Sequence, residues 1–299
     1  MVAQRSRVRP ELHLYHLSSA ANAPLLAAGP LEGEVGVFDL RSGNLLSRYR
    51  TGLDWGGRRL AMSGDGSTVV AAAYSRYGVS AHDALTGRVV WARKDLKHAQ
   101  TLRNSADGGS LFVRADRFTI VDLMSGKETD RLPAIDAIWE SPDGEYRIVE
   151  TMRRLLRISR YGVPVGVVRA EYNLLDCAFG PGFVVVSESG GALRMISLPA
   201  ADEVWRTFLP GPSHATRLCY EPSRGVVLAN AWPYVHGGAG QLLSLDPADG
   251  RLLSAWAGSH YDGVFALDGA CLVLPDATLH NSSSGEFLRS LELVKEWVR

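Results

Sequence analysis

Three histidines and one aspartate in the last third of the chain have the side chains best suited to chemistry. His214, His236, His260 and Asp262 lie close enough in sequence to share one site in a folded chain. Neutral imidazole binds metal ions, and its pKa near physiological pH also allows it to transfer protons. These residues therefore predict a metal-binding or acid–base site. Because no ligand spacing such as His-x-x-x-His accompanies them, three solvated loop histidines are the alternative interpretation.

Exposed aromatic residues are candidates for binding a protein partner, because Trp and Tyr dominate the energetics of interfaces. Trp232 and Tyr234 stand beside His236 in the glycine-rich segment NAWPYVHGGAG (230–240). Long loops that interrupt a regular scaffold commonly carry binding residues. The other aromatic candidates for binding are Trp55, Tyr77 and Tyr261.

A basic stretch between residues 147 and 169 holds six arginines and a single acid, Glu150. The planar guanidinium group suits carboxylate and phosphate oxygens, so Arg153 and Arg154 are candidates for contacts with an acidic partner or an anionic ligand. The alternative, which we favour from sequence alone, is that these arginines alternate along an edge strand. Charged side chains in that position prevent one sheet edge from pairing with another.

The overall composition is that of an ordinary folded protein. The chain has 299 residues, of which 46% are hydrophobic and 21% charged, and its 32 Lys and Arg balance 32 Asp and Glu. With a formal net charge of zero, we expect neither nucleic acid nor an anionic membrane as a partner. No apolar stretch approaches the roughly 18 residues of a membrane-spanning helix.

The N-terminal segment, the cysteines and the basic residues indicate the cellular compartment and the source of the protein. Residues 1–10 read as a flexible basic segment, and no apolar run follows their three arginines, so we expect no secretory signal. The odd number of cysteines, each in an apolar segment, indicates free thiols in a reducing compartment. Arginine far outnumbers lysine, which suggests a GC-rich bacterial genome, and we expect a cytoplasmic bacterial protein. The cysteines are Cys177, Cys219 and Cys271.

The elements that must position these residues are set by an internal repeat. A short turn, usually an Asp or Asn followed by a Gly four residues later, recurs between extended runs. Asp caps backbone amides, and Gly adopts the positive φ that a tight reversal requires. A degenerate form at 197–205 fills the one double interval, which makes seven units. The turn glycines are Gly43, Gly87, Gly126, Gly162, Gly250 and Gly285.

A second series of turns runs out of phase with the first and shares its period of about 40 residues. It reads SGDG (63–66), SADG (105–108), SPDG (141–144), FGPG (179–182), EPSRG (221–225) and ALDG (266–269). The runs between the turns are short and rich in Val, Ile, Leu and aromatic residues, as in β-strands. Four strands in each of seven units predict an all-β, seven-bladed propeller with four-stranded antiparallel blades, occupying residues 11–299 as one domain.

The register of this repeat determines how the ring closes. Assigning strands a to d in chain order places the first strand near 11–17 and the last near 286–293. Each blade is then complete in sequence, and no strand is exchanged to join the ends. The alternative places residues 11–17 on the outer edge of the last blade. Because a closed ring satisfies its own edges, we expect a monomer.

One repeat carries a family motif. Residues 81–91, AHDALTGRVVW, match Ala-x-Asp-x-x-Thr-Gly-x-x-x-Trp at Ala81, Asp83, Thr86, Gly87 and Trp91. The chain thus resembles the quinoprotein-like (PQQ-like) and WD-repeat propeller families. The resemblance implies that the tryptophan docks against the next blade. It does not imply one function, because propellers serve as scaffolds, enzymes and sensors alike.

We expect no cofactor, in spite of this resemblance. Quinone-dependent dehydrogenases of this family are usually exported and carry many copies of the motif, whereas here it is complete only once, so we expect no PQQ. A metal ion held by His214, His236 and His260 is the alternative. In four other units the tryptophan position holds Ser47, Asp130, Ser254 and Arg289.

The strand assignment places the candidate residues on one face, where the d-to-a connections and b-to-c loops surround the channel mouth. We therefore predict a binding or scaffold propeller that uses this loop face for a protein or small-molecule ligand. The alternative is a metal-dependent or acid–base enzyme, of lyase or hydrolase type, acting at the channel mouth near His214, His236 and His260. Because no nucleophile elbow or phosphate-binding loop is present, we lean against an enzyme.

Overall fold

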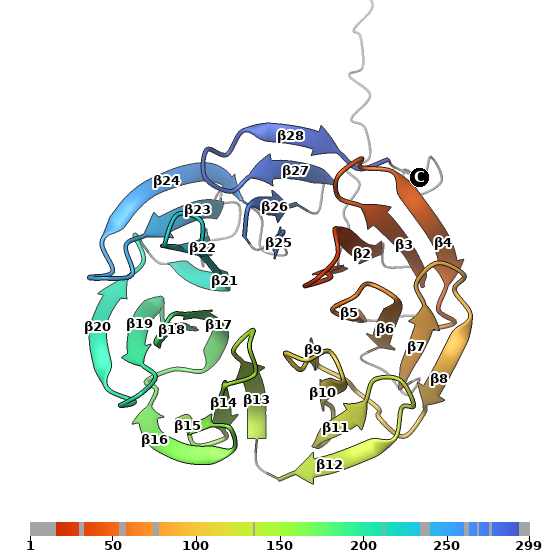
Figure 1. Ribbon diagram of the computed structural model, residues 1–299, viewed down its shortest axis with the longest axis horizontal. Coiled ribbons are helices and arrows are strands. Elements are labelled where there is room, and N and C mark those ends of the chain that lie inside the picture. The colour runs from red at the N-terminus through yellow and green to blue at the C-terminus, as the bar shows by residue number, and fades with distance from the viewer. Residues whose placement is uncertain are drawn as a thin grey trace, which may run out of the picture.

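The fold is a closed ring of seven four-stranded sheets around a central channel, in a computed structural model of the chain (Figure 1). The structure describes residues 16–29, 33–53, 58–73, 78–133, 135–211, 213–233, 240–259, 263–267, 269–274 and 277–292. In each sheet the strands follow chain order outward from the channel, and every neighbouring pair is antiparallel. The predicted all-β, seven-bladed architecture is confirmed.

The blades are numbered 1 to 7 in chain order, and each consists of four consecutive strands, so that β1–β4 form blade 1 and β25–β28 form blade 7. The strands of blades 1 to 4 are β1 (His16–Ser19), β2 (Leu25–Gly29), β3 (Glu34–Asp39), β4 (Leu45–Arg50), β5 (Arg58–Met62), β6 (Thr68–Ala73), β7 (Val79–Asp83), β8 (Val89–Arg93), β9 (Thr101–Asn104), β10 (Ser110–Arg114), β11 (Phe118–Asp122), β12 (Glu128–Leu132), β13 (Ile135–Glu140), β14 (Tyr146–Thr151), β15 (Leu155–Arg160) and β16 (Val163–Arg169). The strands of blades 5 to 7 are β17 (Leu174–Gly180), β18 (Phe183–Glu188), β19 (Ala192–Ser197), β20 (Glu203–Phe208), β21 (Ser213–Glu221), β22 (Val226–Pro233), β23 (Gly240–Leu245), β24 (Leu252–Ser259), β25 (Val264–Ala266), β26 (Cys271–Val273), β27 (Thr278–Asn281) and β28 (Phe287–Ser290).

The predicted turns form the hairpins between the third and fourth strands of the blades. In blade 2, Asp83 Oδ1 accepts the backbone N–H groups of Leu85 at 3.2 Å and Thr86 at 2.8 Å, and Gly87 N donates to Asp83 O at 2.9 Å. Gly87 has a φ of 70°, and a Cβ there would collide with the Tyr49 ring of the preceding blade. Glycine is therefore required both by the backbone conformation and by the packing of adjacent blades.

In several blades an aromatic side chain packs on the turn between the third and fourth strands of the next blade, as the family resemblance implied. Trp91 Nε1 donates to Leu123 O at 2.7 Å, and its ring packs on Gly126. Trp205 Nε1 likewise donates to Pro247 O at 2.8 Å. The sequence interpretation missed this second copy because Ala201, with a φ of 58°, stands where the motif has glycine. The motif tryptophan is thus present in two blades.

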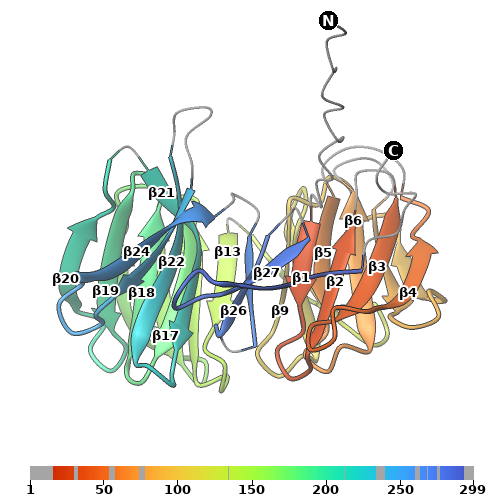
Figure 2. The same ribbon diagram turned by 90° about the horizontal axis from the view of Figure 1, so that it is seen from above.

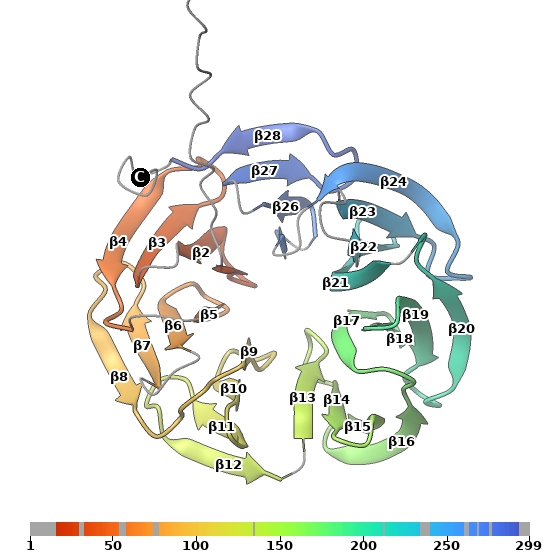
Figure 3. The ribbon, with the colours of Figure 1, turned by 180° about the vertical axis from the view of Figure 1, so that it is seen from behind.

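The ring closes without exchange of a strand between the first and last blades, as the register predicted (Figures 1 and 3). β1 pairs with β2, so the alternative that placed this segment on the outer edge of the last blade is wrong for His16 and Leu17. Apolar side chains of both blades form one buried cluster at the junction. Polar contacts reinforce it: Glu292 N donates to Gly43 O at 2.7 Å, and Ser19 Oγ to Phe265 O at 3.0 Å.

Seen from the side, the blades stand next to one another with their strands running between the two faces of the ring (Figure 2). Since neighbouring strands are antiparallel, the turns that join second to third strands lie on the same face as the connections between blades. The turns that join third to fourth strands lie on the opposite face. In the described part of the chain there is no helix with the length and apolar character needed to cross a membrane.

Candidate functional site

The two kinds of loop predicted to share a face meet in blade 4. Residues 152–154 join β14 to β15, and residues 170–173 lead from β16 to β17 of blade 5. Arg154 Nη1 donates to Glu171 O at 2.5 Å, and Ala170 N donates to Arg154 O at 2.9 Å. Arg154 has a φ of 56°, a left-handed conformation that turns the loop back on itself. The predicted candidates Arg153 and Arg154 therefore lie on the loop face.

A groove with a volume of about 680 Å³ lies between these two loops. Met152 and Tyr172 on its walls are strongly exposed, at 68% and 47% of their surface. Large exposed side chains of this kind supply contact area for a ligand. We call this surface the arginine groove, which is lined by Met152, Arg153, Arg154, Arg169, Ala170, Glu171, Tyr172 and Arg206.

The arginine groove carries an excess of positive charge, since it has four arginines and one carboxylate. Arg206 is neutralised, because it forms ion pairs with Glu171 and, at 3.1 Å, with Glu203. Among the described residues, by contrast, Arg153, Arg154 and Arg169 form no ion pair. The neutral overall composition therefore conceals a local cationic surface suited to anionic groups.

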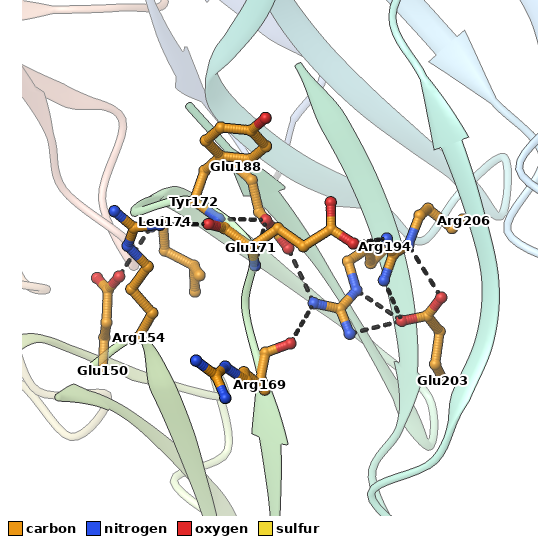
Figure 4. A network of polar contacts seen from close by, with 10 residues as sticks. All are labelled: Glu150, Arg154, Arg169, Glu171, Tyr172, Leu174, Glu188, Arg194, Glu203 and Arg206. Atoms are coloured by element: carbon orange, nitrogen blue, oxygen red, sulfur yellow. Dashed lines mark hydrogen bonds and ion pairs between the residues drawn. The ribbon is translucent and has the colours of Figure 1, made fainter. Parts of the chain in front are cut away.

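A buried ion pair beneath the groove holds one of its walls (Figure 4). Glu188 is fully buried, and its Oε1 accepts from Arg194 Nη1 at 2.9 Å. Its Oε2 accepts the backbone N–H groups of Glu171 at 3.0 Å and Tyr172 at 2.9 Å. One carboxylate thus fixes the loop that carries two groove residues.

Arg194 connects the Glu188 carboxylate to the neighbouring strands that surround the groove. Its guanidinium donates to Arg169 O at 2.9 Å and to Glu203 Oε2 at 2.7 Å, so it links β16, β18, β19 and β20. The Tyr172 ring packs directly over Gly190, where a Cβ would leave no room for it. The groove is therefore held in shape before a ligand arrives, which lowers the entropic cost of binding.

A second buried carboxylate lies beside the groove loops. Glu150 on β14 is 3% exposed, and its Oε1 accepts Leu174 N at 2.9 Å. Burial raises its pKa from the ordinary 4.5 to about 7, an effect that the Leu174 hydrogen bond opposes and the nearby Asp136 carboxylate reinforces. The folded protein therefore retains the Glu150 proton at a pH where the unfolded chain has lost it.

We expect stability to fall between pH 4.5 and pH 7 because of Glu150. In this range the folded state binds more protons than the unfolded state, so the free energy of unfolding decreases as the pH rises, by up to about 3 kcal/mol. Glu150→Gln should remove this component and be more stable than the unmodified protein at pH 8. Urea unfolding at pH 5 and pH 8 measures it. The exposed Glu286→Gln serves as control, and equal pH dependence in all three proteins would contradict the assignment.

The structure brings together two residues of the predicted histidine and aromatic cluster. His214 on β21 and Trp232 on β22 are directly opposed cross-strand neighbours at the loop-face end of blade 6, and both are half-buried. Burial lowers the pKa of His214, which favours the neutral ring. The other members of that cluster lie outside the described residues, as do two further aromatic candidates. These are Tyr234, His236, His260, Tyr261 and Asp262, with Trp55 and Tyr77.

Within the described ranges, no group of three His, Cys, Asp or Glu side chains is arranged to hold a metal ion. Since His236 and His260 fall outside those ranges, the three-histidine site stays a prediction. The cysteines are free, as expected, and Cys177 and Cys219 occupy the innermost strands of consecutive blades. Burial raises the pKa of the Cys177 thiol well above its ordinary value, so it is not an activated nucleophile.

The interpretation of the basic stretch as edge protection was wrong. Arg157 and Arg160 lie on β15, which pairs with β14 on one side and β16 on the other, so this strand has no free edge. Arg160 instead forms an ion pair with Glu145 at 2.6 Å. The sequence interpretation also missed Glu188, Arg194 and Arg206, because no local spacing connects residues on different strands.

The fold and its loop face define the chain as a seven-bladed propeller. A family model described as outer membrane protein assembly factor BamB matches residues 5–130. Among solved structures, the chain is similar to the β-propeller domain of Cps50 (Swd1) from Myceliophteria thermophila, with a TM-score of 0.68 and 15% identity over 91% of this chain and 94% of that one. No curated protein matches the chain. These findings confirm the resemblance to quinoprotein-like and WD-repeat propellers, and the structural likeness shows the fold alone.

Proposed function

We propose that this protein is an interaction propeller that binds an acidic segment of a protein partner in the arginine groove. The observation that carries the proposal is the set of three arginines, Arg153, Arg154 and Arg169, which have no carboxylate partner among the described residues. Guanidinium groups bind carboxylates through paired, charge-assisted hydrogen bonds. Their convergence in one groove therefore favours a ligand with several carboxylates.

The shape and chemistry of the groove support a peptide. Its volume of about 680 Å³ accommodates several side chains, and Met152 and Tyr172 offer apolar contacts between the charges. Because Arg206 is paired with Glu171 and Glu203, the unpaired positive charge of the groove is confined to Arg153, Arg154 and Arg169. An acidic peptide, whose charges are interrupted by other side chains, fits this alternation better than nucleic acid. The propeller fold is consistent with such a scaffold role.

Reversing the charge of the groove should abolish peptide binding. We expect Arg153→Glu/Arg169→Glu to weaken binding of a fluorescently labelled Glu-rich peptide at least 100-fold, because each charge-assisted hydrogen bond contributes about 1.5–3 kcal/mol. Fluorescence anisotropy at low ionic strength measures the affinity. The matched control is Arg41→Glu/Arg88→Glu, which makes the same change of net charge at exposed turns on the opposite face.

Two outcomes would contradict the proposal. Equal loss of affinity in both double variants would mean that net charge, not the groove, attracts the peptide. Tighter binding of a labelled single-stranded oligonucleotide than of the peptide would assign the groove to nucleic acid instead.

We infer a monomeric protein of the bacterial cytoplasm that needs no PQQ and no other resident cofactor for binding. The enzyme alternative near His214, His236 and His260 depends on residues outside the described ranges and stays a prediction.

A further inference from the structure

The central channel contains a second cavity, separate from the arginine groove. Its volume is about 470 Å³, and it is lined by the innermost strands of six blades: β1, β5, β9, β17, β21 and β25, together with Gln100 beside β9. Figure 1 shows these strands surrounding the centre of the ring. Polar side chains dominate the lining, so the cavity is suited to a polar ligand rather than an apolar one.

Three arginines from different blades face this cavity. Arg59 belongs to blade 2, Arg103 to blade 3 and Arg217 to blade 6. Asp176 is the single acidic residue among the lining residues that the structure describes. The channel wall therefore carries more positive than negative charge.

The carboxylate of Asp176 is engaged by groups other than Arg59 and Arg217. Its Oδ1 accepts from Arg103 Nη1 at 2.9 Å and from Trp139 Nε1 at 3.2 Å, while its Oδ2 accepts Leu218 N at 3.0 Å. The Arg103 guanidinium also stacks over the Trp139 ring at 4.7 Å. Asp176 thus neutralises Arg103, and among the described residues it forms no ion pair with Arg59 or Arg217.

Arg59 and Arg217 are held in place by neutral acceptors alone. Arg59 Nε donates to Gln100 O at 2.8 Å, and Arg217 Nη1 donates to Thr216 O at 3.0 Å. Among the described residues neither forms an ion pair. Each guanidinium has five N–H donors, so both retain donors after these single bonds. The wall consequently presents two guanidinium charges that no described carboxylate compensates.

We propose that the channel binds a small anion carrying at least two acidic oxygens, either phosphoryl or carboxylate, between Arg59 and Arg217. The two guanidinium groups provide the charge, and Ser18 adds a hydroxyl whose oxygen accepts Met62 N at 3.0 Å and whose hydrogen has no acceptor among the described residues. A cavity of this size holds a metabolite-sized anion and not a folded segment. This site is independent of the arginine groove and of the function proposed for it.

Isothermal titration calorimetry of the full chain at low ionic strength tests the site, with inorganic phosphate and citrate as probes. We expect one of them to bind with a stoichiometry of one. Binding of phosphate alone assigns a phosphoryl ligand, and binding of citrate alone assigns a polycarboxylate. Arg59→Gln/Arg217→Gln should weaken that binding by about 100-fold or more, since it removes two charge-assisted contacts. Because neither arginine forms an ion pair with a residue that the structure describes, the variant should keep the thermal transition of the unmodified protein.

The control is Arg153→Gln/Arg169→Gln in the arginine groove, which should bind the anion as the unmodified protein does. Arg217→Lys, which keeps the charge, should retain part of the affinity and shows that loss in the double variant is not a failure to fold. The proposal is overturned if the unmodified protein binds neither probe, if Arg59→Gln/Arg217→Gln binds it equally well, or if affinity is lost in the groove variant instead.

Discussion

Arg194→Ala should lower the free energy of unfolding by about 3–5 kcal/mol, because it leaves the carboxylate of Glu188 buried and unpaired. Both partners are inaccessible to water, with Arg194 3% and Glu188 0% exposed. The substitution also removes the donors to Arg169 O and Glu203. Chemical denaturation at pH 7 measures the loss. Arg251→Ala, which breaks only exposed ion pairs with Asp246 and Asp249, should cost less than about 1 kcal/mol.

A further variant separates stability from binding at this ion pair. Arg194→Met/Glu188→Leu replaces the buried charges by apolar groups and should recover much of the stability lost in Arg194→Ala. It also removes the acceptor for the Glu171 and Tyr172 amides, so the groove loop should lose its fixed shape. The double variant should therefore bind the Glu-rich peptide more weakly than the unmodified protein does. If Arg194→Ala unfolds at the same denaturant concentration as the unmodified protein, the ion pair does not stabilise the fold, and if Arg194→Met/Glu188→Leu binds the peptide as tightly as the unmodified protein, Glu188 does not hold the loop.

Asp176→Ala should be destabilising to a similar extent, about 3–5 kcal/mol, because one carboxylate serves three donors from three other blades. Its loss leaves the charge of Arg103, the indole N–H of Trp139 and the amide of Leu218 without their acceptor. Each abandoned buried donor costs about 1–3 kcal/mol. The variant should also weaken the contacts that join blades 3, 4, 5 and 6 through their innermost strands.

Thermal and chemical unfolding, compared with Asp202→Ala, measure this effect. Asp202 is an exposed carboxylate of the same blade, and its replacement should change the free energy of unfolding by no more than about 0.5 kcal/mol. Asp176→Asn keeps an acceptor oxygen, so its loss of unfolding free energy should lie between the losses in Asp176→Ala and Asp202→Ala. If Asp176→Ala changed the free energy of unfolding as little as Asp202→Ala does, Asp176 would not connect the blades.

Much of the fold could be predicted from the sequence because its determinants are local. Asp83 and Gly87 form one turn through contacts within five residues, and the same chemistry repeats around the ring. Repetition at a constant interval then implies the propeller. The fifth unit shows the limit of this reasoning: Ala201 adopts the positive φ of the glycine it replaces, so Trp205 escaped recognition although it docks as Trp91 does.

The candidate site could be predicted only in part. Arg153 and Arg154 were found as candidates because the strand order places their loop on the face of the connections between blades. Their significance depends on which arginines are paired, and the partners lie on different elements: Glu188 pairs with Arg194 on the next strand, and Arg206 pairs with Glu171, 35 residues away. Balanced totals of acidic and basic residues cannot show which arginines remain without a carboxylate.

Hydrogen–deuterium exchange of the full chain, with and without the Glu-rich peptide, tests the proposed binding surface most directly. The loops 152–154 and 170–173 lie on the loop face and carry most of the residues that line the arginine groove. The proposal predicts that peptide binding slows exchange in both segments and leaves the turns of the opposite face, such as 84–88, unchanged. Slower exchange at those opposite turns or along an outer strand that carries no groove residue, such as β8, with no change at 152–154 and 170–173, would contradict it.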